Sequence, residues 1–124
     1  MIPLSFAQRR LWFIDRFEGP SAAYNLPFVL HLSGSLDVAA LSSAVRDLVV
    51  RHESLRTVFG EDDAGVPGQR VLPEEQVRLP VPVTEVAPAD LAGAVAEAVA
   101  HRFDLSAEIP VRARLLRRAD DEHV

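Results

Sequence analysis

The chain has 124 residues, of which 48% are hydrophobic and 25% are charged, and its formal net charge is −5. This composition is typical of one folded domain, and the negative charge disfavours nucleic acid as a partner. The absence of cysteine excludes disulfides and thiolate chemistry, and without a long apolar run or a secretory signal we expect a cytoplasmic protein with no membrane contact.

Helices and strands alternate in the secondary structure that the apolar periodicities predict. In chain order, we expect a helix over 5–17, a strand over 26–32, a helix from 37 to about 52, strands from 57, over 69–72 and over 81–86, a helix from 88 to about 103, and a strand over 111–116. Ser5 and Gln8 have capping-box spacing, and Asp37 is a favourable N-cap. This order predicts an α/β (α+β) sandwich with helices packed on one mixed sheet.

The first helix contains one broad apolar arc with a charged residue in its middle. Phe6, Phe13 and Phe17 lie in this arc, which we expect to face the core, and Arg10 falls among them. Trp12 falls on the opposite, polar side. Removing an arginine from water costs several kcal/mol unless it finds a partner. Arg10 is therefore either a brace paired with a carboxylate or a side chain that reaches the surface along its apolar stem.

The stretch "RHESLRTVF" (51–59) brings three basic side chains to the end of the second helix. His52 continues the apolar stripe of this helix, so it is either a buried charged imidazole, which a helix C-terminus favours, or a hydrogen-bonded structural histidine. Arg51 and Arg56 cannot share a helical face if the helix ends between them, so each needs its own partner. Because a strand follows Arg56, this side chain can be carried into the interior.

The remaining candidate residues form no recognisable catalytic or metal site. His31, His101 and His123 are scattered, and no pair of them has metal-ligand spacing with a third ligand. The sequence contains neither a GxSxG nucleophile motif nor a glycine loop that binds phosphate. The residues alone therefore predict a mixed domain with at least one arginine in its core.

Two stretches, "SFAQRRLWF" (5–13) and "RHESLRTVF" (51–59), resemble the first two core motifs of nonribosomal peptide synthetase condensation domains. The family patterns are Ser-x-Ala-Gln-x-Arg-Leu-Trp and Arg-His-Glu-x-Leu-Arg-Thr-x-Phe, and both are matched at every specified position. The segments "EGPSAAYNLP", "GSLDVAAL" and "FDLSAEIPVRARLLR" also resemble the family, so the resemblance spans nearly the whole chain. Among the subtypes of the family, the motif residues are most similar to those of the subtype that joins two L-configured substrates.

The resemblance implies a chloramphenicol-acetyltransferase-like fold, in which two lobes each contain a sheet with flanking helices. Residues 1–124 would form most of the N-terminal lobe. The family's catalytic motif, His-His-x-x-x-Asp-Gly, would follow Val124, together with the second lobe. The chain is therefore expected to be a fragment, or one half of a split protein, that is inactive on its own.

The resemblance also implies the reaction, the partners and the roles of individual residues. Carrier domains would bring aminoacyl or peptidyl thioesters on phosphopantetheine arms into a tunnel between the lobes, where an amide forms, and no cofactor would be bound directly. The partners would be these carrier domains and the second lobe. Arg56, Arg10 and Arg51 would brace the catalytic loop, with Arg56 preferred as the partner of its aspartate. His52 and Gln8 would be structural polar residues of the core.

Other functions are compatible with the same sequence. An epimerisation or heterocyclisation domain would share the fold, although the first motifs of those domains differ from "SFAQRRLW". A non-catalytic condensation-like module would instead recruit a carrier domain or a tailoring enzyme. A truncated lobe would expose apolar surface and tend to self-associate.

Overall fold

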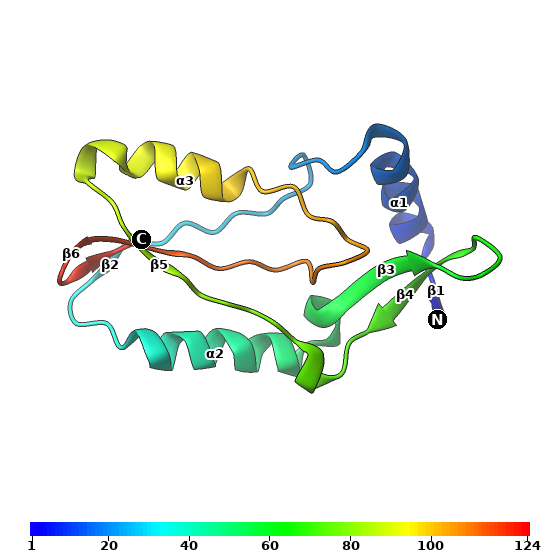
Figure 1. Cartoon of the computed structure of the whole chain (residues 1–124), viewed down its shortest axis with the longest axis horizontal. Helices are drawn as coiled ribbons and strands as arrows, with labels where there is room; N and C mark the ends of the chain where they lie inside the picture. The colour runs from blue at the N-terminus through cyan, green and yellow to red at the C-terminus, as the bar shows by residue number, and fades with distance from the viewer.

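The computed structural model describes all 124 residues and contains three α-helices and seven short strands (Figure 1). In chain order the elements are β1 (Ile2–Pro3), α1 (Phe6–Glu18), β2 (Leu32–Ser33), α2 (Val38–Arg51), the 3-10 helix η1 (Glu53–Arg56), β3 (Thr57–Glu61), β4 (Pro67–Val71), η2 (Glu74–Gln76), β5 (Val83–Glu85), η3 (Pro88–Asp90), α3 (Leu91–Val99), β6 (Leu115–Ala119) and β7 (Glu122–His123). No helix combines the length and the apolar character that crossing a membrane requires.

The strands form two sheets instead of the one mixed sheet expected from the sequence. One sheet contains three antiparallel strands in the order β1–β4–β3. The other contains four strands in the order β2–β7–β6–β5, of which only β5 and β6 are parallel neighbours. In the view of Figure 1, α2 and α3 lie on opposite sides of the four-stranded sheet, and α1 lies beside the three-stranded sheet at the other end of the molecule.

The predicted starts of the first two helices are confirmed because they depend on local hydrogen bonds, whereas α3 begins at Leu91, after the 3-10 helix η3, instead of at residue 88. The Ser5 hydroxyl accepts the backbone N–H of Gln8 (3.2 Å), and the Gln8 side-chain oxygen accepts the N–H of Ser5 (2.8 Å). Asp37 caps α2 by accepting the N–H of Ala40 (3.0 Å). After α1, Gly19 adopts φ 81°, a conformation that glycine permits without steric cost, and the helix ends there.

Several predicted elements are shorter in the structure because a strand needs a neighbour as well as a pattern. Residues 26–31 have no partner strand, so only the end of the predicted strand 26–32 is kept, as β2. The last predicted strand begins at Leu115 instead of residue 111. Helix α3 ends at Val99, four residues before the predicted end, and the two-residue strands β1 and β7 were not predicted.

The buried core is small for a chain of this length. Its hydrophobic cluster contains Val49 from α2, Val58 from β3, and Val77 and Ile109 from connecting segments. Only 10 of the 124 residues are buried. The accessible surface is 8552 Å², whereas a compact monomer of 13.6 kDa exposes about 6,600 Å². The difference, about 2,000 Å², is larger than the roughly 800 Å² that each partner contributes to a standard protein–protein interface.

The pairing of β1 with β4 leaves no room for a side chain at Gly68. An added Cβ would lie 2.9 Å from the Cβ of Met1 and 3.2 Å from the carbonyl oxygen of Ile2. We expect Gly68→Ala to displace β1 and to lower the free energy of unfolding by about 1–3 kcal/mol. Gly60 pairs with Gly68 but has open space around it, so Gly60→Ala should change this free energy by less than about 0.5 kcal/mol. Urea unfolding measures both variants, and equal stabilities would contradict the close packing of β1.

Candidate functional site

Arg56 is the most enclosed of the three candidate arginines. It is the last residue of η1, directly before β3, and its side chain is 13% exposed. Its Nε donates to the backbone carbonyl of Val50 (3.2 Å), and its Nη1 donates to the carbonyl of Leu72. Its Nη2 lies 3.6 Å from the carboxylate of Glu53. Arg56 therefore connects the end of α2 to the segment that follows β4.

The backbone around Arg56 is held by further hydrogen bonds. The carbonyl of Arg56 accepts the N–H of Leu72 (2.8 Å). The hydroxyl of Thr57, a buried residue, donates to the carbonyl of Glu53 (2.7 Å) and closes the 3-10 turn. Since both the side chain and the backbone of Arg56 are engaged, the guanidinium has a fixed position between α2 and β3.

Arg51 and His52 end α2 with exposed side chains. The backbone of His52 terminates the helix: its N–H donates to Leu48 (3.1 Å), and its carbonyl accepts the N–H of Leu55 (2.9 Å). Its φ of −112° and ψ of 104° are extended, so the apolar stripe of the helix does not continue through this residue. The expectation that His52 lies in the core is therefore wrong for this structure, and Arg51 makes no side-chain hydrogen bond or ion pair.

Helix α1 is turned the opposite way from the orientation that the apolar arc predicts. Phe6, Phe13 and Phe17 are 91%, 60% and 87% exposed, and Arg10 is exposed among them. Trp12, which was expected to point outward, is half-buried. The inward position expected for Arg10 is therefore corrected to an outward one. We refer to Phe6, Arg10, Phe13 and Phe17 together as the α1 face.

A pair of glutamines explains the orientation of α1. The side chain of Gln8 donates to the side-chain oxygen of Gln69 in β4 (3.2 Å), and Gln69 donates to the carbonyl of Pro3 (3.2 Å). At about 100° per residue, Gln8 shares a side of the helix with Trp12, opposite the three phenylalanines. The polar side of α1 is thereby attached to the three-stranded sheet. The arc of apolar residues around the helix could not predict this contact, because that pattern takes only hydrophobic side chains into account.

A second polar cluster joins the end of α3 to the residues that precede β6. His101 contacts the carboxylate of Glu108 through Nε2 (3.0 Å) and the guanidinium of Arg112 through Nδ1. The side chain of Asn25 donates to the carbonyls of Val99 (3.0 Å) and His101 (2.7 Å). A guanidinium only donates hydrogen bonds, so these contacts fit the tautomer in which Nδ1 accepts from Arg112 and Nε2 donates to Glu108. Sequence spacing gave no signal for this cluster because Asn25 and His101 are 76 positions apart.

The loop within this cluster is closed by its own hydrogen bonds and contacts β3. The Asp104 carboxylate accepts the hydroxyl of Ser106 (2.6 Å) and its backbone N–H (3.0 Å). These bonds, led by that from the Ser106 hydroxyl, hold the pKa of Asp104 below its usual range. The carbonyl of Leu105 accepts the N–H of Phe59 (2.8 Å), so the loop is attached to the three-stranded sheet.

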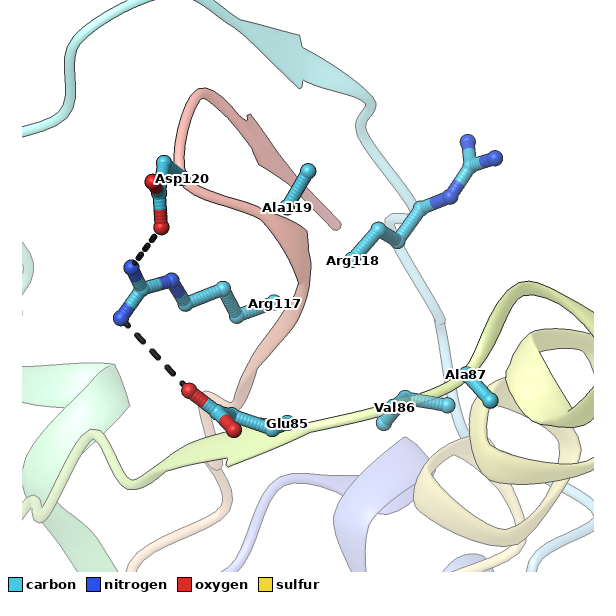
Figure 2. Close-up of a pocket in the computed structure, with 7 residues that line it drawn as sticks. All are labelled: Glu85, Val86, Ala87, Arg117, Arg118, Ala119 and Asp120. Atoms are coloured by element: carbon cyan, nitrogen blue, oxygen red, sulfur yellow. Dashed lines mark hydrogen bonds and ion pairs between the residues drawn. The ribbon is translucent and has the colours of Figure 1, made fainter.

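A shallow hollow of about 300 Å³ beside β5 and β6 contains none of the candidate residues (Figure 2). Its central side chain, Arg117, lies 2.6 Å from the carboxylate of Asp120 and 3.7 Å from that of Glu85. Figure 2 shows Arg118 pointing away from this group. Because two carboxylates already surround Arg117, its charge is not free to bind an anion. The structure also contains no group of three or more side chains positioned to hold a metal ion.

The amino-acid sequence matches a known family along its whole length. The family, described as Condensation domain, matches residues 1–124. The chain is 52% identical over 126 residues to the isonitrile lipopeptide synthase of Mycobacterium tuberculosis and 50% identical over 123 residues to a dimodular nonribosomal peptide synthase of Bacillus subtilis. Each alignment covers 99% of this chain and 5% of the relative's length.

Solved structures of similar proteins have the same fold. The X-domain in its complex with OxyB from teicoplanin biosynthesis has a TM-score of 0.82 at 38% identity, with 98% of this chain and 26% of that chain covered. The condensation domain from Monacolin K polyketide synthase MokA has a TM-score of 0.80 at 28% identity, with 98% and 28% covered. The fold class that the sequence motifs implied is therefore confirmed.

The bonds of Arg56 predict a large stability difference between two arginines. Arg46 lies exposed on α2 and makes one hydrogen bond, to the carbonyl of Glu74 (3.2 Å). We expect Arg56→Ala to lower the free energy of unfolding by roughly 2–4 kcal/mol, because two carbonyl groups lose their donor, and Arg46→Ala to lower it by less than about 1 kcal/mol. Chemical denaturation of the two variants measures the difference. Similar losses would show that Arg56 does not hold the turn between α2 and β3.

Proposed function

Since the chain belongs to the condensation-domain family, we propose that it is part of an enzyme domain that forms amide bonds between carrier-bound aminoacyl or peptidyl thioesters in nonribosomal peptide synthesis. The observation that carries this proposal is the family match over residues 1–124, together with about 50% identity to two peptide or lipopeptide synthases. The substrates would arrive on phosphopantetheine arms of two carrier domains. The residues of the two motifs support the subtype that joins two L-configured substrates.

In the proposed reaction, the acceptor amine attacks the carbonyl carbon of the donor thioester. A C–N bond forms, the C–S bond breaks, the phosphopantetheine thiol leaves with the donor carrier, and the amine gives up a proton. Holding both arms in line inside one tunnel lowers the entropic part of the barrier, and well-oriented systems gain about 7–11 kcal/mol in this way. A histidine of the family motif would accept the proton or orient the amine.

We assign residues 1–124 to most of the N-terminal lobe of such a domain. The 124 residues contain no His-His-x-x-x-Asp-Gly stretch, and we place this motif in residues that follow Val124. The small core and the surface of 8552 Å² support the assignment, because a lobe that packs against another lobe keeps apolar area exposed when considered alone. The exposed α1 face is one such area.

The three arginines would serve this domain in two ways. Arg56 is already engaged by nearby carbonyl groups, so we assign it to holding the junction of α2 and β3. Arg10 and Arg51 are exposed and have no polar side-chain partner, which supports either as the direct partner of the motif aspartate. Arg10 is the better candidate because its phenylalanine neighbours would desolvate it once the α1 face is covered, and a desolvated guanidinium requires a carboxylate.

A second candidate function is a non-catalytic module that recruits a tailoring enzyme. One observation favours it: the X-domain that this chain resembles at 38% identity is described in a complex with OxyB. An assay with the complete domain and two loaded carriers separates the two functions. Product that carries a new amide and depends on both carriers supports the enzyme. Carrier binding without product would support the recruitment module.

Matched substitutions in α1 test the bracing role of Arg10. Arg9 and Arg10 are adjacent and exposed, but only Arg10 belongs to the α1 face. In the complete domain, Arg10→Ala should slow amide formation by about tenfold or more, equivalent to about 1.4 kcal/mol, because the catalytic loop loses its partner. Arg9→Ala should change this rate by less than about twofold. In the chain of 124 residues, neither substitution should alter the unfolding midpoint, and equal rates for both complete domains would contradict the role.

A further inference from the structure

His101, which follows α3, contacts three other segments of the chain. Its backbone carbonyl accepts the side chain of Asn25 (2.7 Å), and its ring packs edge-on against that of Phe103, with the ring centroids 4.8 Å apart. Its two ring nitrogens contact Glu108 and Arg112. The side chain is 26% exposed, so protons from the solvent reach it. Histidine is the side chain that ordinarily changes charge between about pH 5 and pH 8.

The two ring nitrogens of His101 face groups of opposite charge. Nε2 lies 3.0 and 3.2 Å from the two carboxylate oxygens of Glu108, whereas Nδ1 contacts the guanidinium of Arg112. The other contacting residues, Asn25 and Phe103, carry no charge. A second proton on the ring therefore strengthens the contact with the carboxylate. The same proton turns the contact with the guanidinium into two facing donors of like charge.

The carboxylate of Glu108 is held in place by the loop that it belongs to. Its Oε1 also accepts the backbone N–H of Asp104 (2.9 Å), and its own N–H donates to the carbonyl of Asp104 (2.9 Å). The Asp104 side chain is in turn bound by the hydroxyl and the N–H of Ser106. Because these bonds do not involve the imidazole, the carboxylate stays beside Nε2 whether the ring is neutral or charged.

The side chain of Arg112 is held by the imidazole alone. It is exposed and makes no other hydrogen bond or ion pair. Arg114, two residues further along the same extended segment, is paired instead with Glu97 of α3 (4.0 Å). Moving an exposed guanidinium away from a surface partner and into water costs little free energy. The repulsion that a second ring proton creates is therefore relieved by movement of Arg112, and not by movement of the loop.

We infer that His101 is a pH-sensitive switch that holds Arg112 while its imidazole is neutral and releases it when the ring takes up a second proton. The contact is present above the pH at which the ring titrates and is lost below it. After release, Arg114 and Glu97 form the remaining ion pair between residues 111–114 and α3. Acid thus detaches the segment before β6 from the residue that follows α3.

NMR on the chain of 124 residues at pH 8 and pH 5 tests the switch. Long-range ¹H–¹⁵N correlations report which ring nitrogens carry protons, and nuclear Overhauser effects report the contacts. At pH 8 we expect an unprotonated Nδ1 and an Overhauser effect between the ring of His101 and the δ-methylene of Arg112. At pH 5 we expect both nitrogens to be protonated and this effect to be lost. The effect between the rings of His101 and Phe103 should remain at both pH values.

Two variants provide the controls. The amide of His101→Gln offers an acceptor and a donor but takes up no proton, so the chemical shifts of the Arg112 δ-methylene should be the same at both pH values. Arg114→Ala removes a neighbouring arginine that does not contact the imidazole, so this variant should respond to pH as the unchanged chain does.

Four outcomes would overturn the inference. An Nδ1-protonated neutral ring at pH 8 would show that Arg112 has no acceptor there. A ring that stays neutral at pH 5 would show that the cluster does not sense pH. Persistence of the Arg112 contact on a doubly protonated ring would show that the arginine is not released. Loss of the Phe103 contact together with that of Arg112 would show that the whole loop opens. None of these readouts depends on amide formation.

Discussion

The two residues of β7 are the structural link on which the four-stranded sheet depends. They pair with β2 on one edge and β6 on the other, and thereby connect the segment after α1 to the segment after α3. Peptide groups that leave water need hydrogen-bond partners, so the positions of these segments follow from the ladder that β7 provides. Where the ladder stops, the backbone remains extended but unpaired. The pairing of β7 with β2 and β6 therefore determines where residues 26–31 and 111–114 approach the sheet.

Local interactions made part of this fold predictable. The capping box of Ser5 and Gln8 and the cap at Asp37 involve residues three positions apart, so the sequence alone marks the starts of α1 and α2. The segment 26–32 alternates as a strand does, but alternation cannot supply a neighbouring strand, and only its last residue belongs to β2. Strands as short as β1 and β7 have no detectable period, and their existence depends on distant partners.

The orientation of α1 shows why the predicted site had to be revised. An apolar arc is assumed to face the core of its own domain, and that assumption placed Arg10 inside. Here the bond between Gln8 and Gln69 attaches the polar side of the helix, and the aromatic side is left free. The pattern marked the phenylalanines as residues to be covered, but the core of these 124 residues leaves them exposed.

The two sequence motifs that carry the family resemblance have a shared physical role in this structure. In the first, Ser5 and Gln8 begin α1 and attach it to β4; in the second, Arg56 and Thr57 attach α2 to β3. Most of these polar residues are thus engaged in holding helices against sheets. Arg10, Arg51 and His52 are the exceptions, since their side chains make no hydrogen bond or ion pair.

An exposed charge within an apolar surface constrains what can cover that surface. Burying the α1 face would bring a favourable hydrophobic contribution, but it would also remove the guanidinium of Arg10 from water. A purely apolar cover would leave that charge unpaired at a cost of several kcal/mol, and such a complex would be disfavoured. A partner surface that places a carboxylate opposite Arg10 keeps the hydrophobic contribution and also pairs the guanidinium. The charge therefore selects among apolar partners, and any partner that binds only this folded arrangement also stabilises it.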